Sequence, residues 1–221
     1  STGIGLEIAN QLVNENNVIV ASRNKGELND DIKHLEFDVL KDNIEDLDLP
    51  EEIHGLVYCP GSINLKPFKM LKHKDFEEEM NLNFLSLVKV VQEVLPKLKK
   101  AENASLVFFS TVAVKVGMPF HTSVAAAKGA IEGFAKSLAA EYAPSLRVNV
   151  IAPSLTDTPL AEKLLSNDSK KEKMSERHPL KRVGNAKDIA NAATFLLSDE
   201  NSWITGQIIG VDGGLSTLNI S

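Results

Sequence analysis

The chain has 221 residues, of which 43% are hydrophobic and 24% are charged, enough for one well-buried domain but short for two. The net charge of −6 argues against a broad binding surface for nucleic acid or anionic membrane. The single cysteine, Cys59, excludes an internal disulfide, no apolar run is long enough to cross a bilayer, and no signal peptide opens the chain. We therefore expect a cytoplasmic protein, and the sequence indicates no metal site.

Short β-rich runs alternate with longer helical patterns along the chain. In order, the patterns predict a helix from Leu6 to Val13, strands at 17–22, 35–39 and 54–61, a helix from Asp75 to Leu95, a strand at 105–110, a helix at 123–142, a strand at 147–153, a helix at 188–198 and a strand at 206–214. Apolar strands that alternate with helices are typical of a parallel sheet covered on both faces. We found no internal repeat or linker, so residues 1–221 are expected to form a single α/β domain with a doubly wound parallel sheet.

The first five residues, STGIG, have the composition of a loop that enters a helix. Such a loop usually follows a strand in the middle of the sheet. Either the chain shown lacks about ten residues at its start, or the fold lacks its central strand. We favour the first alternative, because a sheet without its middle strand would have two unpaired edges.

Gly3, Ile4 and Gly5 form a candidate phosphate-binding loop. Glycine lets the backbone approach a pyrophosphate, and the following helix offers free N–H groups and the positive end of its dipole. Arg23 follows the first predicted strand, where an acidic residue would bind a ribose 2′-hydroxyl and an arginine suits a 2′-phosphate. This favours NADP(H) over NAD(H), although Arg23 could also simply face solvent.

The most polar stretch of the chain, residues 166–178, interrupts the strand–helix alternation. Its position after the carboxyl end of a strand indicates a mobile flap over a ligand site, roughly 155–182, and the alternative is an inert surface loop. Within the flap, four leucines would suit an apolar substrate or would simply pack the lid on its own domain: Leu155, Leu160, Leu164 and Leu165.

Several segments, in the same order, resemble the short-chain dehydrogenase/reductase family, and the resemblance covers essentially the whole chain. STGIG resembles the end of the family's glycine-rich motif, and Phe37-Asp38-Val39 resembles the end of its third strand. Residues 80–98, 147–160 and 203–214 are similar to its active-site asparagine helix, sixth strand and last strand. The resemblance implies a Rossmann-type fold that lacks its first strand in the chain shown, and hydride transfer between a nicotinamide and a carbonyl or alcohol.

The resemblance also implies roles for individual residues. Asp38, with Val39, would contact adenine, Thr158 would contact the diphosphate, and Gly61 in YCPG would lie near the cofactor. Lys128 matches the catalytic lysine that binds the nicotinamide ribose, and Asn83 matches the asparagine that holds a relay water.

The family's catalytic tyrosine stands four residues before the lysine, and here that position is Val124. The catalytic serine position falls on Thr111, whose hydroxyl can donate the same hydrogen bond. The two tyrosines of the chain, Tyr58 and Tyr142, do not have the required spacing. A replacement proton donor could be His121, because histidine as a residue type can exchange a proton near neutral pH, or a water held by Thr111, Lys128 and Asn83.

Two hypotheses follow from this pattern. The first is an oxidoreductase with a non-standard proton donor, which acts on a small carbonyl or alcohol. The second is a catalytically silent NADP(H)-binding sensor or regulatory protein. In the family the two long helices, Asp75–Leu95 and 123–142, pair between subunits, which implies a homodimer or homotetramer.

Overall fold

A computed structural model describes residues 1–219 of the chain. The helices are α1 (Gly3–Leu12), α2 (His73–Met80), α3 (Ser86–Leu98), α4 (Val112–Lys115), α5 (Thr122–Tyr142), α6 (Asp168–Glu176) and α7 (Ala186–Leu197). The strands are β1 (Ile19–Ser22), β2 (Lys33–Glu36), β3 (Gly55–Tyr58), β4 (Ala104–Phe109), β5 (Leu146–Pro153), β6 (Thr156–Asp157), β7 (Gly184–Asn185) and β8 (Ile208–Val211). The predicted α/β fold with a parallel sheet is confirmed.

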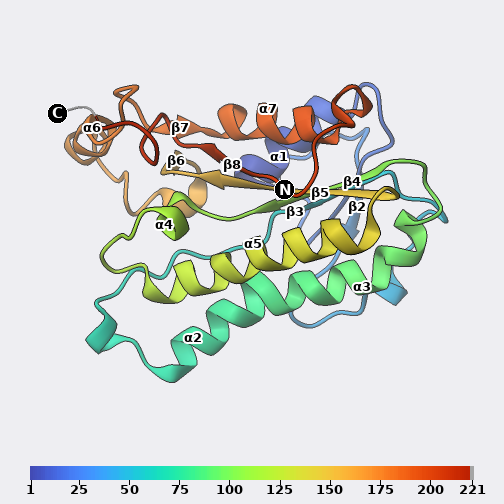
Figure 1. Ribbon diagram of the computed structural model, residues 1–221, viewed down its shortest axis with the longest axis horizontal. Helices are drawn as coiled ribbons and strands as arrows, with labels where there is room; N and C mark the ends of the chain where they lie inside the picture. The colour runs from blue at the N-terminus through green and yellow to red at the C-terminus, as the bar shows by residue number, and fades with distance from the viewer. Residues whose placement is uncertain (220–221) are drawn as a thin grey trace.

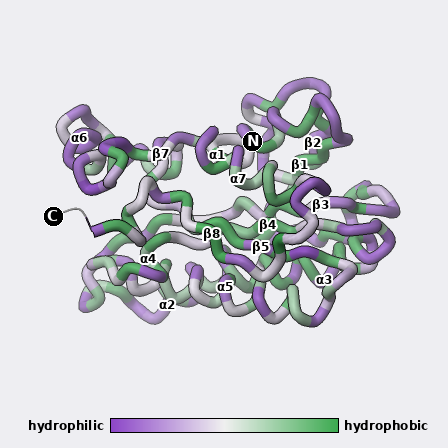
Figure 2. The backbone as a smooth tube through the Cα atoms, turned by 45° about the horizontal axis from the view of Figure 1, so that its top comes forward, coloured by the Kyte–Doolittle hydropathy of each residue, from purple (hydrophilic) through white to green (hydrophobic). Residues whose placement is uncertain are grey.

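The strands form a parallel sheet between two helical layers. β3, β4, β5 and β8 pair in that order, and β1 pairs with β2. Figure 1 shows α2, α3 and α5 on one side of the sheet and α1 and α7 on the other. Successive side chains of β4 face opposite sides of the sheet. Leu106 and Phe108 pack toward α3 and α5, whereas Val107 and Phe109 pack toward α7. Figure 2 shows apolar segments gathered along the central strands and a hydrophilic α6 at the periphery.

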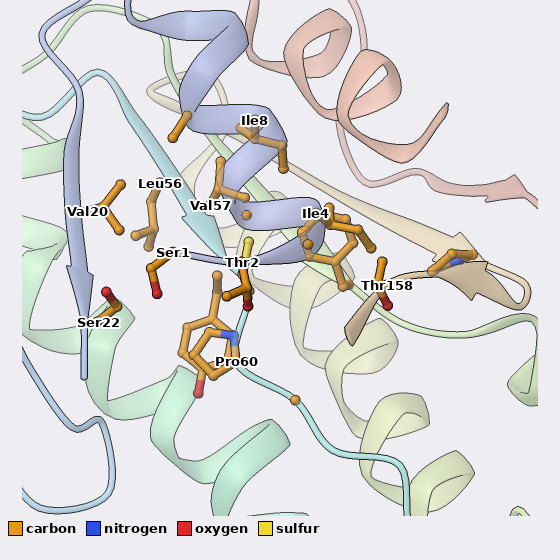
Figure 3. Close-up of a pocket in the computed structure, with 18 of the residues that line it drawn as sticks. Ser1, Thr2, Ile4, Ile8, Val20, Ser22, Leu56, Val57, Pro60 and Thr158 are labelled. Carbon is orange, nitrogen blue, oxygen red and sulfur yellow. The ribbon is translucent and has the colours of Figure 1, made fainter. Parts of the chain in front are cut away.

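The sheet is divided between β1 and β3, which within residues 1–219 belong to separate sheets. A cavity of 1980 Å³ runs through this division and is lined by Val20 of β1 and by Leu56 and Val57 of β3. Figure 3 shows Val20 at β1 across from Leu56 and Val57 at β3, with α1 passing beside them. The division lies where a strand that precedes the STGIG loop would be expected to pair in the middle of the sheet.

Three of the differences between the predicted segments and the structure have a clear physical reason. The strand predicted at 35–39 is β2, which ends earlier because the backbone turns back after it: Lys41 N and Asp42 N both donate to Asp38 O. The helix predicted from Asp75 to Leu95 is continuous but changes to π-helix over Asn81–Leu85. Most of the polar stretch 166–178 forms helix α6, in which the Asn167 side chain accepts from Lys170 N and caps the first turn. Its role as a flap over the cavity stays a prediction.

Within residues 1–219, none of the helices combines the length and apolar character needed to cross a membrane.

Candidate functional site

The large cavity brings together most of the residues that the sequence singled out. Its walls include the ends of β1, β3, β4 and β5, the start of α1 and the flap. The predicted residues that line it are Gly3, Ile4, Gly5, Arg23, Asp38, Val39, Gly61, Thr111, His121, Lys128 and Thr158. Asn83 is the exception, since it is completely buried behind the wall.

The glycine loop faces the predicted diphosphate contact. Gly3 has a φ of +54°, a conformation that favours glycine, and a Cβ there would lie 3.4 Å from Thr158 Cβ. Figure 3 shows Thr158 next to Ile4 at the start of α1. The N-cap residue Thr2 makes no side-chain capping bond, and the first turn of α1 has no acidic residue. This cradle fits an anionic phosphate group.

Arg23 and Asp38 lie near one another on the β1–β2 side of the cavity. Asp38 accepts from Leu40 N at 3.1 Å and forms an ion pair with Lys41 at 3.2 Å. The Leu40 hydrogen bond, and then Lys41 and Arg23, hold the pKa of the Asp38 carboxyl below its usual value. Arg23 is exposed, so its guanidinium is accessible to an anionic ligand, while Val39 packs partly into the core.

On the opposite side of the cavity, Lys128 and Asn83 lie near each other. Lys128 is 8% exposed, and burial lowers the pKa of its ammonium to about 8, an effect that Glu79 opposes. A Cβ at Gly61 would lie 3.4 Å from both Lys128 Nζ and Asn83 Oδ1. Glycine at this position therefore leaves a small space into which both polar atoms project.

Thr111 and Val124, the two residues expected near Lys128, both line the cavity. Thr111 Oγ1 accepts from Ala113 N at 3.3 Å as the N-cap of α4, so its hydrogen can be donated to a ligand. The neighbouring Ser110 instead donates to Glu132 on α5. Val124 on α5 is 5% exposed and has no group that can donate a proton.

His121 is positioned as the N-cap of α5. Its Nδ1 lies 2.7 Å from Pro119 O, which fits a donated hydrogen bond and directs Nε2 away from that carbonyl. Its side chain makes no capping hydrogen bond to the helix.

The two tyrosines are engaged elsewhere. The Tyr58 hydroxyl donates to Leu82 O at 2.9 Å and contacts Ser86, and burial raises its pKa to about 12. Tyr142 ends α5 and lies beneath Lys99. Neither tyrosine therefore provides an accessible acid near Lys128.

The flap is tied to the sheet by a histidine that sequence reasoning missed. His178 is 3% exposed, with Nε2 2.8 Å from Ser154 Oγ and Nδ1 2.9 Å from Met174 O. Leu155, Leu160 and Leu164 line the cavity, whereas Leu165 does not. The sequence contained no local signal for the contact between His178 and Ser154, because the two residues are 24 positions apart.

Glu79 and Ser62 were also missed, although both contact Asn83. Glu79 precedes Asn83 by four residues, a spacing that places the two side chains on one helix face. Within residues 1–219, no group of three or more histidine, cysteine, aspartate or glutamate residues is placed to hold a metal ion.

Residues 1–216 match the family described as Enoyl-(Acyl carrier protein) reductase. The chain is 39% identical to 3-oxoacyl-[acyl-carrier-protein] reductase FabG of Thermotoga maritima over 66% of its own length and 58% of that protein's. It is 40% identical to a tropinone reductase homolog of Datura stramonium over 64% of its length and 54% of that protein's. The matches thus span only part of these relatives.

Solved structures share the fold over nearly the whole chain. Ligand-free aldohexose dehydrogenase of Thermoplasma acidophilum has a TM-score of 0.89 at 28% identity, over 100% of this chain and 92% of that one. The Cj0485 dehydrogenase has a TM-score of 0.87 at 28% identity, over 99% and 92%. Together with the ordered motifs and the parallel sheet, these matches show that the chain belongs to the short-chain dehydrogenase/reductase family.

Proposed function

We propose that the protein is an NADP(H)-dependent oxidoreductase that transfers hydride between the cofactor and a carbonyl or alcohol, with a proton donor other than tyrosine. The observation that carries this proposal is the placement of Thr111 and the buried Lys128 along the same cavity as the Gly3 cradle. The relatives named as reductases support the reaction class.

Each residue of the site has a role in this reaction. Bound NADPH would supply the hydride. The α1 N-terminus and Thr158 would hold the diphosphate, and Lys128 would hold the nicotinamide ribose. The Thr111 hydroxyl would donate a hydrogen bond to the substrate oxygen, which stabilises negative charge as it develops there.

The donor of the proton to the substrate oxygen is the part of the proposed reaction in which the chain departs from its family. His121 Nε2 is one candidate donor, and a water held by Thr111, Lys128 and Asn83 is the other. His121 lines the same cavity as Lys128, which supports the histidine. The unpartnered Asn83 Oδ1 beside the Lys128 ammonium supports the water.

A second candidate function is a catalytically silent NADP(H)-binding sensor or regulatory protein. Val124 supports it, because this apolar residue occupies the cavity wall four residues before Lys128. In that case Lys128 and Arg23 would still bind the cofactor, but no hydride would be transferred.

Deuterium transfer separates the two functions. The protein is incubated with NADPH that carries deuterium at one face of the nicotinamide C4, then the other, and with a pool of aldehydes and ketones. Deuterium in an alcohol product supports the enzyme and identifies a substrate. NADPH binding without deuterium transfer would instead support the silent protein.

The substrate and the assembly can also be proposed from the site. Leu155, Leu160 and Leu164 give the flap side of the cavity an apolar wall, which suits a small apolar carbonyl compound. We propose a homodimer or homotetramer in the cytoplasm, formed through the α2–α3 and α5 layer. A monomer in light scattering at micromolar concentration would refute the assembly.

A further inference from the structure

Glu79 is a buried carboxylate in a run of exposed ones. Its neighbours Glu77 and Glu78 on α2 face solvent and lie near His73 and Lys74, whereas Glu79 is 3% exposed. A carboxylate in such a place requires hydrogen-bond donors. Glu79 Oε2 accepts from Ser62 Oγ at 2.7 Å and from Asn83 Nδ2 at 2.8 Å.

These hydrogen bonds determine the orientation of the Asn83 amide. Asn83 Nδ2 also donates to the backbone oxygen of Glu79 at 2.9 Å, so the amide nitrogen has two acceptors on the Glu79 side. A reversed amide would place its oxygen against these two oxygens. Asn83 Oδ1 must therefore point the other way, where it is buried and has no partner within the described residues.

The unpartnered oxygen projects into the space that Gly61 leaves open beside Lys128. A Cβ at Gly61 would be 3.4 Å from Asn83 Oδ1 and 3.4 Å from Lys128 Nζ. The lysine ammonium, or one water between the two atoms, can satisfy this acceptor. A polar connection thus leads from Glu79 through Asn83 toward Lys128.

Glu79 also lies between the large cavity and a second one. Lys128 lines the large cavity, Glu79 lines the neighbouring cavity of 770 Å³, and Ser62 lines both. The other charged groups around Glu79 are engaged: Asp75 pairs with Lys66 at 2.8 Å, and Lys89 donates to Asn43. Among these charged groups, Glu79 is therefore the buried carboxylate that lies toward Lys128.

We propose that Glu79 is a positioning residue for the proposed reaction, which orients the Asn83 carbonyl toward Lys128 and places a negative charge near the lysine ammonium. The inference rests on the proposed function for its catalytic consequence. Its structural content, the coupling of Glu79 to Lys128, is measurable without turnover.

The direction of the effect follows from electrostatics. Burial lowers the pKa of Lys128 to about 8, and Glu79 opposes that decrease, as would the Cys59 thiolate. Cys59 is exposed, and an ordinary thiol is mostly protonated near pH 8, which leaves Glu79 as the main anion near Lys128. Loss of the Glu79 charge should therefore lower the pKa of Lys128 further.

The test is an NMR titration of the Lys128 side chain, assigned by comparison with Lys128→Arg. In Glu79→Gln the titration midpoint should fall by about one pH unit. Glu78→Gln makes the same charge change one residue away on an exposed side chain, and should leave the midpoint unchanged. A folded Glu79→Gln protein with the wild-type midpoint would overturn the proposal.

A second measurement uses the wild-type protein and does not depend on the folding of a variant. The carboxyl ¹³C signal of Glu79 should show an inflection at the same pH as the Lys128 titration, because the two charges interact. Absence of that inflection would also overturn the proposal.

The turnover assay separates this proposal from the proposed function. If an alcohol product is formed, the basic limb of the kcat profile should move to lower pH in Glu79→Gln. Coupled titration without any deuterium transfer would refute only the oxidoreductase. Transfer without coupled titration would refute only the role of Glu79.

Discussion

The two sides of the cavity differ in how well their strands are packed. All six residues of β4 are buried, and β5 is buried except at Pro153, so the wall that carries Thr111 rests on a complete core. β1 and β3 are mostly half-buried, because they face the division in the sheet. Arg23 and Asp38 belong to the β1–β2 side. Catalysis and cofactor selectivity should therefore depend on different regions and be separable by mutation.

The largest expected effect comes from restoring a phenol on the well-packed side. Val124→Tyr places a hydroxyl one helical turn before Lys128, and a positioned general acid is worth about 10²–10⁴-fold in rate. We expect kcat for carbonyl reduction to rise by about that factor, measured as NADPH oxidation.

Val124→Phe is the matched control, since it adds the same ring without the hydroxyl. The difference between the two variants isolates proton donation from the effect of added bulk in the wall. Equal rates for Val124→Tyr and Val124→Phe would show that the remaining geometry cannot use a phenol.

The packing of the two sides can be compared by making the same substitution, valine to alanine, once on each side. In a protein of residues 1–221 alone, Val107→Ala in fully buried β4 should lower the free energy of unfolding by about 2–3 kcal/mol, whereas Val20→Ala in β1 should cost about 1 kcal/mol or less. Denaturant unfolding monitored by circular dichroism measures both. Equal losses would contradict the inferred difference between the two sides.

This contrast also explains which features could be predicted from sequence. Residues 106–109 are uniformly apolar, and β4 is shifted by only one residue from the strand predicted at 105–110, because a run of apolar residues is typical of a buried parallel strand. Periodicity could not place the π-helix at Asn81–Leu85, since a single turn is too short to produce a period of its own in the sequence.

Sequence could predict those site residues that match a family motif one by one, but not the residues that contact them in the folded protein. The structure places Lys128, Thr111 and the glycine loop around one cavity, while their roles stay predictions. The buried Glu79 could not be predicted, because a run of glutamates at a helix start has the composition of a solvated face. Its contact with Ser62 depends on the tertiary fold, which no local pattern encodes.

A smaller effect is expected for cofactor selectivity on the β1–β2 side. If Arg23 binds the 2′-phosphate, Arg23→Ser should weaken NADPH binding by about 10–100-fold and leave NADH binding nearly unchanged. Lys25→Ser removes a neighbouring charge outside the cavity wall and controls for net charge. Equal weakening of both cofactors in Arg23→Ser would contradict the role of Arg23, and fluorescence titration measures it.

The smallest effect concerns the attachment of the flap to the well-packed side. Ser154 follows β5, and its hydroxyl contact with His178 at 2.8 Å ties the segment after α6 to the sheet. Removing one such hydrogen bond costs about 1 kcal/mol, which corresponds to about a fivefold increase in local opening. We therefore expect Ser154→Ala to accelerate amide hydrogen exchange in α6 by about that factor, while β4 amides remain unchanged. Ser166→Ala removes a flap hydroxyl whose partner, Lys170, is exposed, and should leave exchange in α6 nearly at the wild-type rate. If both variants accelerated exchange equally, the flap would be held by its own helix rather than by β5, and its position over the cavity would not depend on the core beneath it.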